Sequence, residues 1–172
     1  ASRVEIFDAT RRFERANTSD GPRAPVHAAH NDYTEKSAPQ RVRDLLGEMA
    51  ETLLGRRYAF INVWRPLQGP VVSSPLAVAD ARTVAPGDLV ATDLVYADRI
   101  GEIYHLHPNP EHRWFYYPQM TAHEALLLKC FDSATDGTAR FAPHTAFTDP
   151  NTPAGAPGRE SIEVRTIAFF EP

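Results

Sequence analysis

Hydrophobic and polar residues alternate along much of this chain, and that period of two predicts short β-strands. Residues 3–7 alternate and run into Asp-Ala-Thr, which predicts a short strand followed by a turn. Residues 15–25 are rich in turn formers and are predicted to be a loop, as is the Pro-rich segment 149–158. Further strands are predicted over residues 26–33, 58–65, 71–79, 101–107, 112–117, 125–132, 139–147 and 161–170. A short Pro-Asn-Pro connection predicts that 101–107 and 112–117 form a hairpin.

Only one long helix is predicted. Ser37 stands where an N-cap is expected, Pro39 falls in the first turn, and Gly55 ends the segment. Between these signals an apolar face recurs at helical spacing, formed by Val42, Leu45, Leu46, Met49, Leu53 and Leu54. Residues 85–89 are predicted to be a turn with a short helical piece.

The many strands, the single long helix and the Pro-rich connections together predict a mainly β fold. We expect a double-stranded β-helix, which is a jelly-roll or cupin-like core, with one long flanking helix. The length of 172 residues suits one domain with a real core, and 42% apolar with 23% charged residues is an ordinary globular composition.

Charge and cysteine content exclude several classes of function. With 18 basic and 22 acidic side chains the formal charge is −4, so no basic surface for nucleic acid or an anionic membrane is expected. No apolar run approaches the roughly 20 residues of a membrane-spanning helix, and no signal peptide is visible. The single cysteine, Cys130, excludes an internal disulfide and a thiolate metal cage, so a cytoplasmic location is expected.

A candidate metal site begins at His30-Asn31-Asp32. In an extended segment residues i and i+2 point to the same side, so His30 and Asp32 can bind one ion. Two histidines and one carboxylate form the usual ligand set of non-haem iron(II) oxygenases, and the third ligand then comes from a distant strand. His144 is the best candidate because its surroundings are apolar and strand-like.

Polar residues near this candidate site indicate a co-substrate. After the loop that follows His144 come Arg159 and Ser161, which together suit the carboxylate of a dicarboxylic acid. Asn62 and Trp64 share one face of a strand and are placed to support the co-substrate or the metal ligands.

Substrate contacts are predicted for Trp64, Lys129 and Arg65, with ordinary ion pairs as the alternative for the two charged residues. His105 and His107 form a rival histidine pair, for which packing or a substrate-pocket role is the favoured interpretation. A Ser-His-Asp hydrolase is not supported, since no serine stands in a Gly-x-Ser-x-Gly setting.

Beyond these spacings, the chain resembles a known family over nearly its whole length. The resemblance is carried by the segments HNDYT, FINVWRP, LVATDLVYADRIGEIY, NPEHRWFYYPQM, LLLKCFDSATDG, ARFAPHTAF and RESIEVR. The family includes the hydroxylase component of cephamycin methoxylation and fungal gibberellin desaturase-like proteins, and it is similar to iron(II)/2-oxoglutarate-dependent oxygenases. The resemblance implies that His30, Asp32 and His144 bind iron(II), and that Arg159 and Ser161 bind 2-oxoglutarate. The fifteen-residue step from His144 to Arg159 is longer than in better-known relatives, so Arg165 is an alternative anchor.

From this resemblance we expect a dioxygenase that hydroxylates or desaturates a small organic molecule in specialised metabolism. Its partners would be the substrate and dioxygen, with a second copy or a partner enzyme as further options. Residues 1–172 are expected to form a single oxygenase-like domain that can lack an N-terminal segment present in other members. Two alternatives stay open: a cupin-like metal enzyme that does not use 2-oxoglutarate, and a non-catalytic accessory subunit of a two-component system.

Overall fold

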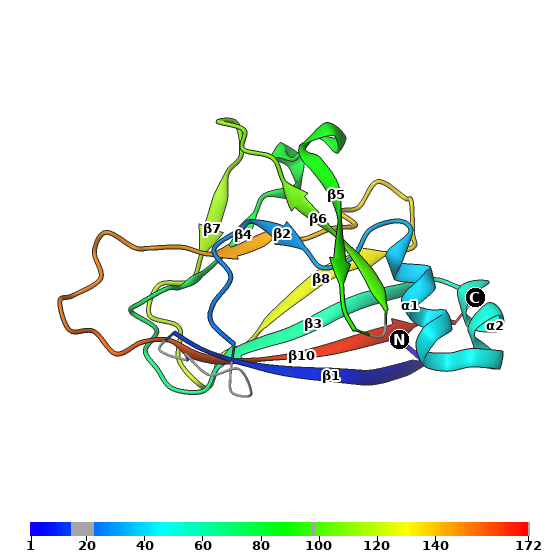
Figure 1. Ribbon diagram of the computed structural model, residues 1–172, viewed down its shortest axis with the longest axis horizontal. Coiled ribbons are helices and arrows are strands. Elements are labelled where there is room, and N and C mark those ends of the chain that lie inside the picture. Colours follow the sequence, from blue (N-terminus) through cyan, green and yellow to red (C-terminus); the bar gives the residue numbers. More distant parts are fainter. Residues whose placement is uncertain (15–22, 98, 172) are drawn as a thin grey trace.

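Two antiparallel β-sheets face each other in the computed structural model, which describes residues 1–14, 23–97 and 99–171 (Figure 1). One sheet has four long strands and is called the large sheet below. Its order is β1 (Arg3–Phe13), β10 (Glu160–Phe169), β3 (Tyr58–Pro66), β8 (Leu126–Asp132). The six-stranded sheet has the order β5 (Leu89–Val95), β6 (Ile100–Leu106), β2 (His30–Asn31), β9 (His144–Ala146), β4 (Leu76–Ala79), β7 (Trp114–Tyr116). The prediction of a mainly β, jelly-roll-like fold is therefore confirmed.

The hydrophobic core lies on the inner face of the large sheet and beneath the helical segment. Alternate residues of β3 point inward, and Phe60 and Trp64 are at most 2% exposed. Phe131 packs edge-to-face on Phe60, with ring centroids 6.4 Å apart. The same inner face carries the buried polar residues Asn62 and Ser161.

The predicted helix over residues 37–54 is divided into α1 (Ser37–Leu46), a 3₁₀ turn η1 (Gly47–Met49) and α2 (Ala50–Leu54). Its N-terminus is stabilised by Thr34, whose hydroxyl accepts the Ser37 N–H at 3.0 Å while Ser37 Oγ accepts the Thr34 N–H at 2.9 Å. Thr34 thus takes the capping role predicted for Ser37, and Ser37 reciprocates from the first turn. The break falls at Gly47, where φ is 51° and ψ is −122°.

Gly47→Ala tests whether this break depends on glycine. An added Cβ would meet nothing within 4 Å at Gly47, so the expected loss of about 1–3 kcal/mol comes from the backbone conformation alone. Gly87→Ala is the matched control, because Gly87 also has open space around it but no positive φ. Urea denaturation of both variants measures the difference. Equal stability of the two would show that the helix does not need the strained conformation.

Several strand predictions need correction. β1 continues through the predicted Asp-Ala-Thr turn to Phe13, because the chain absorbs the irregularity as a bulge between Ile6 and Asp8 and remains paired with β10. The strand predicted over 26–33 shrinks to β2, and the one predicted over 71–79 to β4. Residues 15–22 of the predicted loop lie outside the described residues.

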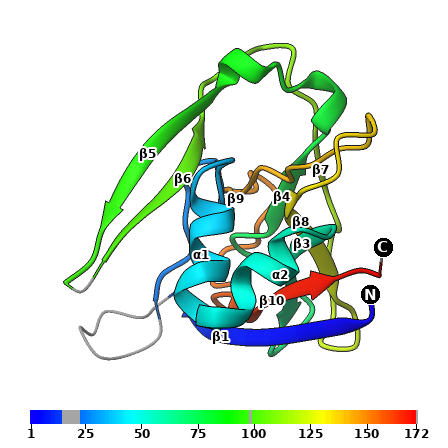
Figure 2. The ribbon, with the colours of Figure 1, turned by 90° about the vertical axis from the view of Figure 1, so that its right-hand side faces the viewer.

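The predicted hairpin of 101–107 with 112–117 is wrong. β6 instead pairs with β5, a strand that was not predicted, and β7 pairs with β4. β5 and β6 form one edge of the six-stranded sheet, and α1 and α2 cover one end of the two sheets (Figure 2). None of the helices in the described ranges is long and apolar enough to cross a membrane.

Candidate metal centre

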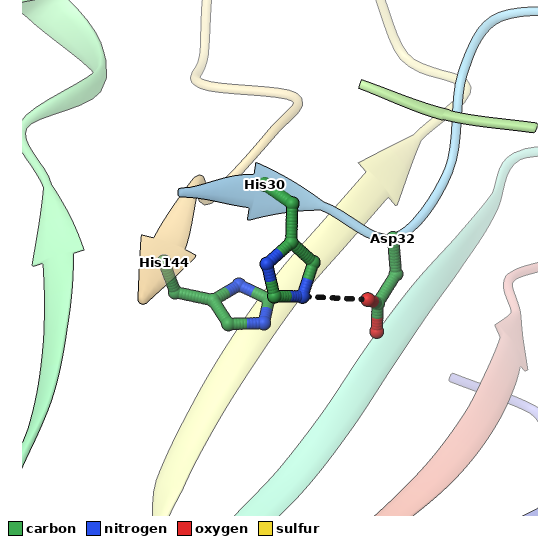
Figure 3. A group of neighbouring side chains, drawn as sticks. All are labelled: His30, Asp32 and His144. Carbon is green, nitrogen blue, oxygen red and sulfur yellow. Dashed lines mark ion pairs between the residues drawn. The ribbon is translucent and has the colours of Figure 1, made fainter. Parts of the chain in front are cut away.

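His30, Asp32 and His144 come together between the two sheets (Figure 3). β2 lies between β6 and β9, and its register places His30 directly opposite His144. Residues that oppose each other on antiparallel strands project to the same face, so the two imidazoles lie side by side with ring centroids 4.6 Å apart. Asp32 follows two residues after His30, and its Oδ1 is 3.4 Å from His30 Nε2. One ligand atom from each of the three residues lies within 4.8 Å of the others.

Backbone carbonyl groups orient both histidines. His30 Nδ1 is 2.8 Å from Ala28 O, and His144 Nδ1 is 2.9 Å from Ala142 O. A carbonyl oxygen can only accept, so each Nδ1 carries a hydrogen, and in the neutral imidazole each Nε2 keeps its lone pair for another partner. Burial, and then the neighbouring His30, lower the pKa of His144 to about 4, so this imidazole is neutral at neutral pH.

Asn62 and Arg165 stabilise the ionised form of Asp32 through the carboxylate oxygen that points away from the histidines. Asp32 Oδ2 accepts hydrogen bonds from Asn62 Nδ2 at 2.7 Å and from Arg165 Nε at 3.4 Å, which leaves Oδ1 toward the histidines. Burial by itself would raise the pKa of Asp32, but the His30 hydrogen bond and the positive charge of Arg165 hold that pKa well below its ordinary value. Despite burial, the same contact with Asp32 raises the pKa of His30, so the group offers one anionic oxygen, the neutral imidazole of His144 and the imidazole of His30.

Arg165 is already occupied by carboxylates of the protein. Besides Asp32, it binds Glu163 Oε1 through Nη2 at 2.8 Å and Asp8 through Nη1. These contacts disfavour Arg165 as the alternative anchor for a dicarboxylate. Sequence reasoning missed Glu163, although the alternation of the 161–170 segment places it on the same face as Ser161 and Arg165.

Three buried polar atoms have no hydrogen-bond partner in the described part of the chain: Asn62 Oδ1, Arg159 Nε and Ser161 Oγ. These atoms belong to the three residues for which a co-substrate contact was predicted. Leaving such an atom unpaired costs about 1–3 kcal/mol, so three of them in one region point to a ligand that supplies the partners.

Other contacts hold the Arg159 side chain in place, although its Nε has no partner among the described residues. Its guanidinium donates through Nη1 to Ser74 O and lies over the Trp64 ring, 5.4 Å from the centroid. Its backbone N–H donates to Glu14 Oε2 at 2.8 Å, and its side chain is among the buried charged groups of the protein. Trp64 therefore contributes the surface on which the guanidinium rests.

The residues present fit both a metal ion and a carboxylate ligand. Two imidazole nitrogens and one carboxylate oxygen are the donors that iron(II) accepts in oxygenases, and this set leaves coordination positions open. The unpaired N–H of Arg159 and O–H of Ser161 are the donors that a carboxylate requires. Of the described residues, His30, Asp32 and His144 are the one set of three or more His, Cys, Asp or Glu side chains that meets this geometry.

Arg65 and Lys129 are not brought to this site. Arg65 follows Trp64 on β3 and therefore points to the opposite face, where its Nη2 donates to Ala122 O at 2.7 Å. Lys129 pairs in register with Ile61, which also faces outward, and its Nζ binds Asp132 at 3.1 Å. Both follow the ion-pair or surface alternative rather than the predicted substrate contact.

The two members of the rival histidine pair have different surroundings. His105 opposes His30 in register, and its Nδ1 lies 3.1 Å from Thr92 Oγ1. His107 is exposed, with Nδ1 3.1 Å from Pro108 O. Neither belongs to the group of three side chains that could hold an ion in the described part of the chain.

Comparison with known proteins gives consistent matches. A family model described as an oxidoreductase/YMDC permease-like domain matches residues 1–169. The hydroxylase/desaturase asaB of Aspergillus flavus is 44% identical over 137 residues, which cover 71% of this chain and 60% of asaB. Aspirochlorine biosynthesis protein N of Aspergillus oryzae is 41% identical over 162 residues, which cover 88% of this chain and 68% of that protein.

A solved structure matches as well. The iron and alpha-ketoglutarate-dependent endoperoxidase NvfI superposes with a TM-score of 0.91 at 32% sequence identity. The match covers 99% of this chain and 63% of NvfI. The chain therefore spans about two thirds, or less, of the length of the relatives that it matches.

Proposed function

The chain belongs to the oxidoreductase family that includes the fungal hydroxylase/desaturases, and from that premise we propose that it is an iron(II)- and 2-oxoglutarate-dependent oxygenase. Its substrate is a small organic molecule of specialised metabolism, which it hydroxylates or desaturates. The observation that carries the proposal is the convergence of His30, Asp32 and His144 beside buried donors that lack a partner.

His30, Asp32 and His144 would hold iron(II), with the two Nδ1–H groups fixed by backbone carbonyls. When bound, iron(II) and 2-oxoglutarate supply the oxidising chemistry, in which dioxygen and 2-oxoglutarate become succinate and carbon dioxide while the substrate gains one oxygen atom or loses two hydrogens as water. The protein's own contribution is to keep Asp32 ionised and His144 neutral, so that these two ligands need not lose a proton when the ion binds.

Arg159 and Ser161 would bind the carboxylate of 2-oxoglutarate that is remote from the metal. The guanidinium is immobilised by Ser74 O and the Trp64 ring, so little side-chain entropy is lost when the acid binds. Asn62 links the two halves of the site, since its amide N–H donates to Asp32 while its Oδ1 stays unpaired.

Anaerobic reconstitution tests this function. Addition of iron(II) and then 2-oxoglutarate to the purified protein should give one equivalent of bound iron and the weak visible absorption of the chelated 2-oxoacid. Admission of oxygen with a panel of small organic substrates should then release succinate in the presence of a true substrate.

Each failure has its own meaning. Bound iron with no response to 2-oxoglutarate indicates a metal enzyme with another co-substrate. Absence of stoichiometric iron indicates an accessory role and overturns the proposal.

A further inference from the structure

Arg12 is a basic residue outside the group of side chains assigned to the proposed site. It stands on β1, whose alternation places Asp8, Thr10 and Arg12 on the sheltered face and Arg11 on the exposed face. The register of β1 with β10 puts Arg12 directly opposite Ser161. The Arg12 side chain therefore lies on the same inner face as the unpaired hydroxyl of Ser161.

The two neighbours of Ser161 on this face differ in chemistry. On β3 the opposing residue is Pro66, which is apolar and buried, and on β1 it is Arg12. Directly opposed Cβ atoms are about 4.5–5.5 Å apart, and an arginine side chain is long enough to reach a group bound at its neighbour. A carboxylate at Ser161 thus meets an apolar wall on one side and a guanidinium on the other.

The positive charges of Arg12 and Arg159 act on each other. Burial, and then the charge of Arg12, lower the pKa of Arg159 to about 10, so both guanidinium groups remain charged at neutral pH. Two like charges close to each other repel, and the carboxylate of Glu163 offsets this repulsion only in part for both groups. A bound carboxylate next to Ser161 would offset it further.

Arg12 is also oriented by the backbone. Its Nη1 donates to Ala24 O at 2.9 Å, which engages one of the five N–H donors of the guanidinium. The segment that carries Ala24 is bound to β1 by two further hydrogen bonds, from Phe13 N to Arg23 O and from Arg23 N to Arg11 O. The Arg12 guanidinium therefore has a fixed backbone partner at this end of β1.

We propose that Arg12 is a second guanidinium that binds the remote carboxylate of 2-oxoglutarate together with Arg159 and Ser161, and that it selects dicarboxylic over monocarboxylic 2-oxoacids. The inference rests on the proposed function, because it assigns a further residue to the same co-substrate.

The test compares Arg12→Gln with Arg11→Gln, its neighbour on the exposed face. The iron(II)-loaded proteins are titrated anaerobically with 2-oxoglutarate and with 2-oxobutyrate, which lacks the remote carboxylate. Arg12→Gln should raise the Kd for 2-oxoglutarate about 10- to 100-fold, as expected for a lost charged hydrogen bond, and leave the Kd for 2-oxobutyrate within about twofold. Arg12→Lys should fall between wild type and Arg12→Gln, and Arg11→Gln should match wild type.

Two results overturn the role of Arg12 alone. One is equal affinity of Arg12→Gln and Arg11→Gln for 2-oxoglutarate. The other is an equal loss for both 2-oxoacids, which would assign Arg12 to holding Ala24. If Arg12→Gln does not fold, Arg12→Lys makes the same comparison, because it keeps the charge and loses the planar fork. A wild-type protein that binds iron but no 2-oxoglutarate overturns the proposed function itself, and the Arg12 proposal with it.

Discussion

Asp32→Asn is expected to lower iron(II) affinity by more than about 100-fold and to abolish succinate release, because loss of a mere outer-shell partner of a metal ligand already costs about 10- to 100-fold. The substitution preserves size and leaves an oxygen able to accept from Asn62 and Arg165. What it removes is the single anionic donor of the group His30, Asp32 and His144. Iron content after dialysis against a chelator of known affinity measures the loss.

Asp8→Asn is the matched control for this experiment. Asp8 also pairs with Arg165, but its side chain is 42% exposed and it does not belong to the metal-binding group. We expect its iron affinity to match wild type. Retention of iron by Asp32→Asn would mean that Asp32 is not a ligand. An equal loss of iron in the Asp8 variant would mean that both carboxylates act through Arg165.

The candidate metal ligands could be chosen from the sequence because their spacing reflects backbone geometry. His30 and Asp32 are two residues apart, and an extended chain sends such a pair to one side. The distant partner, His144, could be chosen by context and by family resemblance. The structure adds the reason that they meet, which is the direct pairing of His30 with His144 across two very short strands. No local pattern gives that register, because β2 has only two residues and its place depends on the strands on either side.

Which face of a strand turns inward was harder to predict. Arg65 and Lys129 are polar residues in apolar segments, and this composition is equally compatible with a lined cavity and with an outer ion pair. The register of β3 with β8, which includes a bulge between Phe60 and Ile61, determines that Lys129 faces outward. The missed β5 strand has a similar origin, since its exposed hydrophobic residues Val90 and Val95 give no clean alternation of buried and solvent-facing positions.

The site divides its tasks between the two sheets. The six-stranded sheet supplies the two histidines. The large sheet supplies Ser161 and the charged residues behind Asp32, and Arg159 directly precedes its strand β10. Asn62 and Arg165 are the links, because both stand on the large sheet and bind the carboxylate of Asp32. A change in the charge balance of the large sheet should therefore affect both stability and the position of a metal ligand.

Arg165→Met should destabilise the protein by roughly 3–5 kcal/mol, the usual cost of removing one partner from a buried ion pair. Arg165 is 16% exposed and lies between Asp32 and Glu163, whose side chains are 10% and 6% exposed. Without this guanidinium, the two buried carboxylates lose their shared cation, and Asn62 Nδ2 remains as a donor to both. Burial, and then the negative charge of Asp32, already raise the pKa of Glu163 above its ordinary value. The charged form of Glu163 is therefore already disfavoured while Arg165 is present.

Urea denaturation of the metal-free protein measures this loss without interference from bound iron. Arg3→Met is the control: Arg3 pairs with Glu5 on the same sheet, but their side chains are 39% and 33% exposed, so its loss should stay within about 1 kcal/mol. A loss for Arg165→Met as small as that of the control would mean that the two carboxylates relax or are neutralised without cost. Asp32 would then owe its position to His30 and Asn62 alone, and the link between the large sheet and the metal ligand would reduce to a single amide.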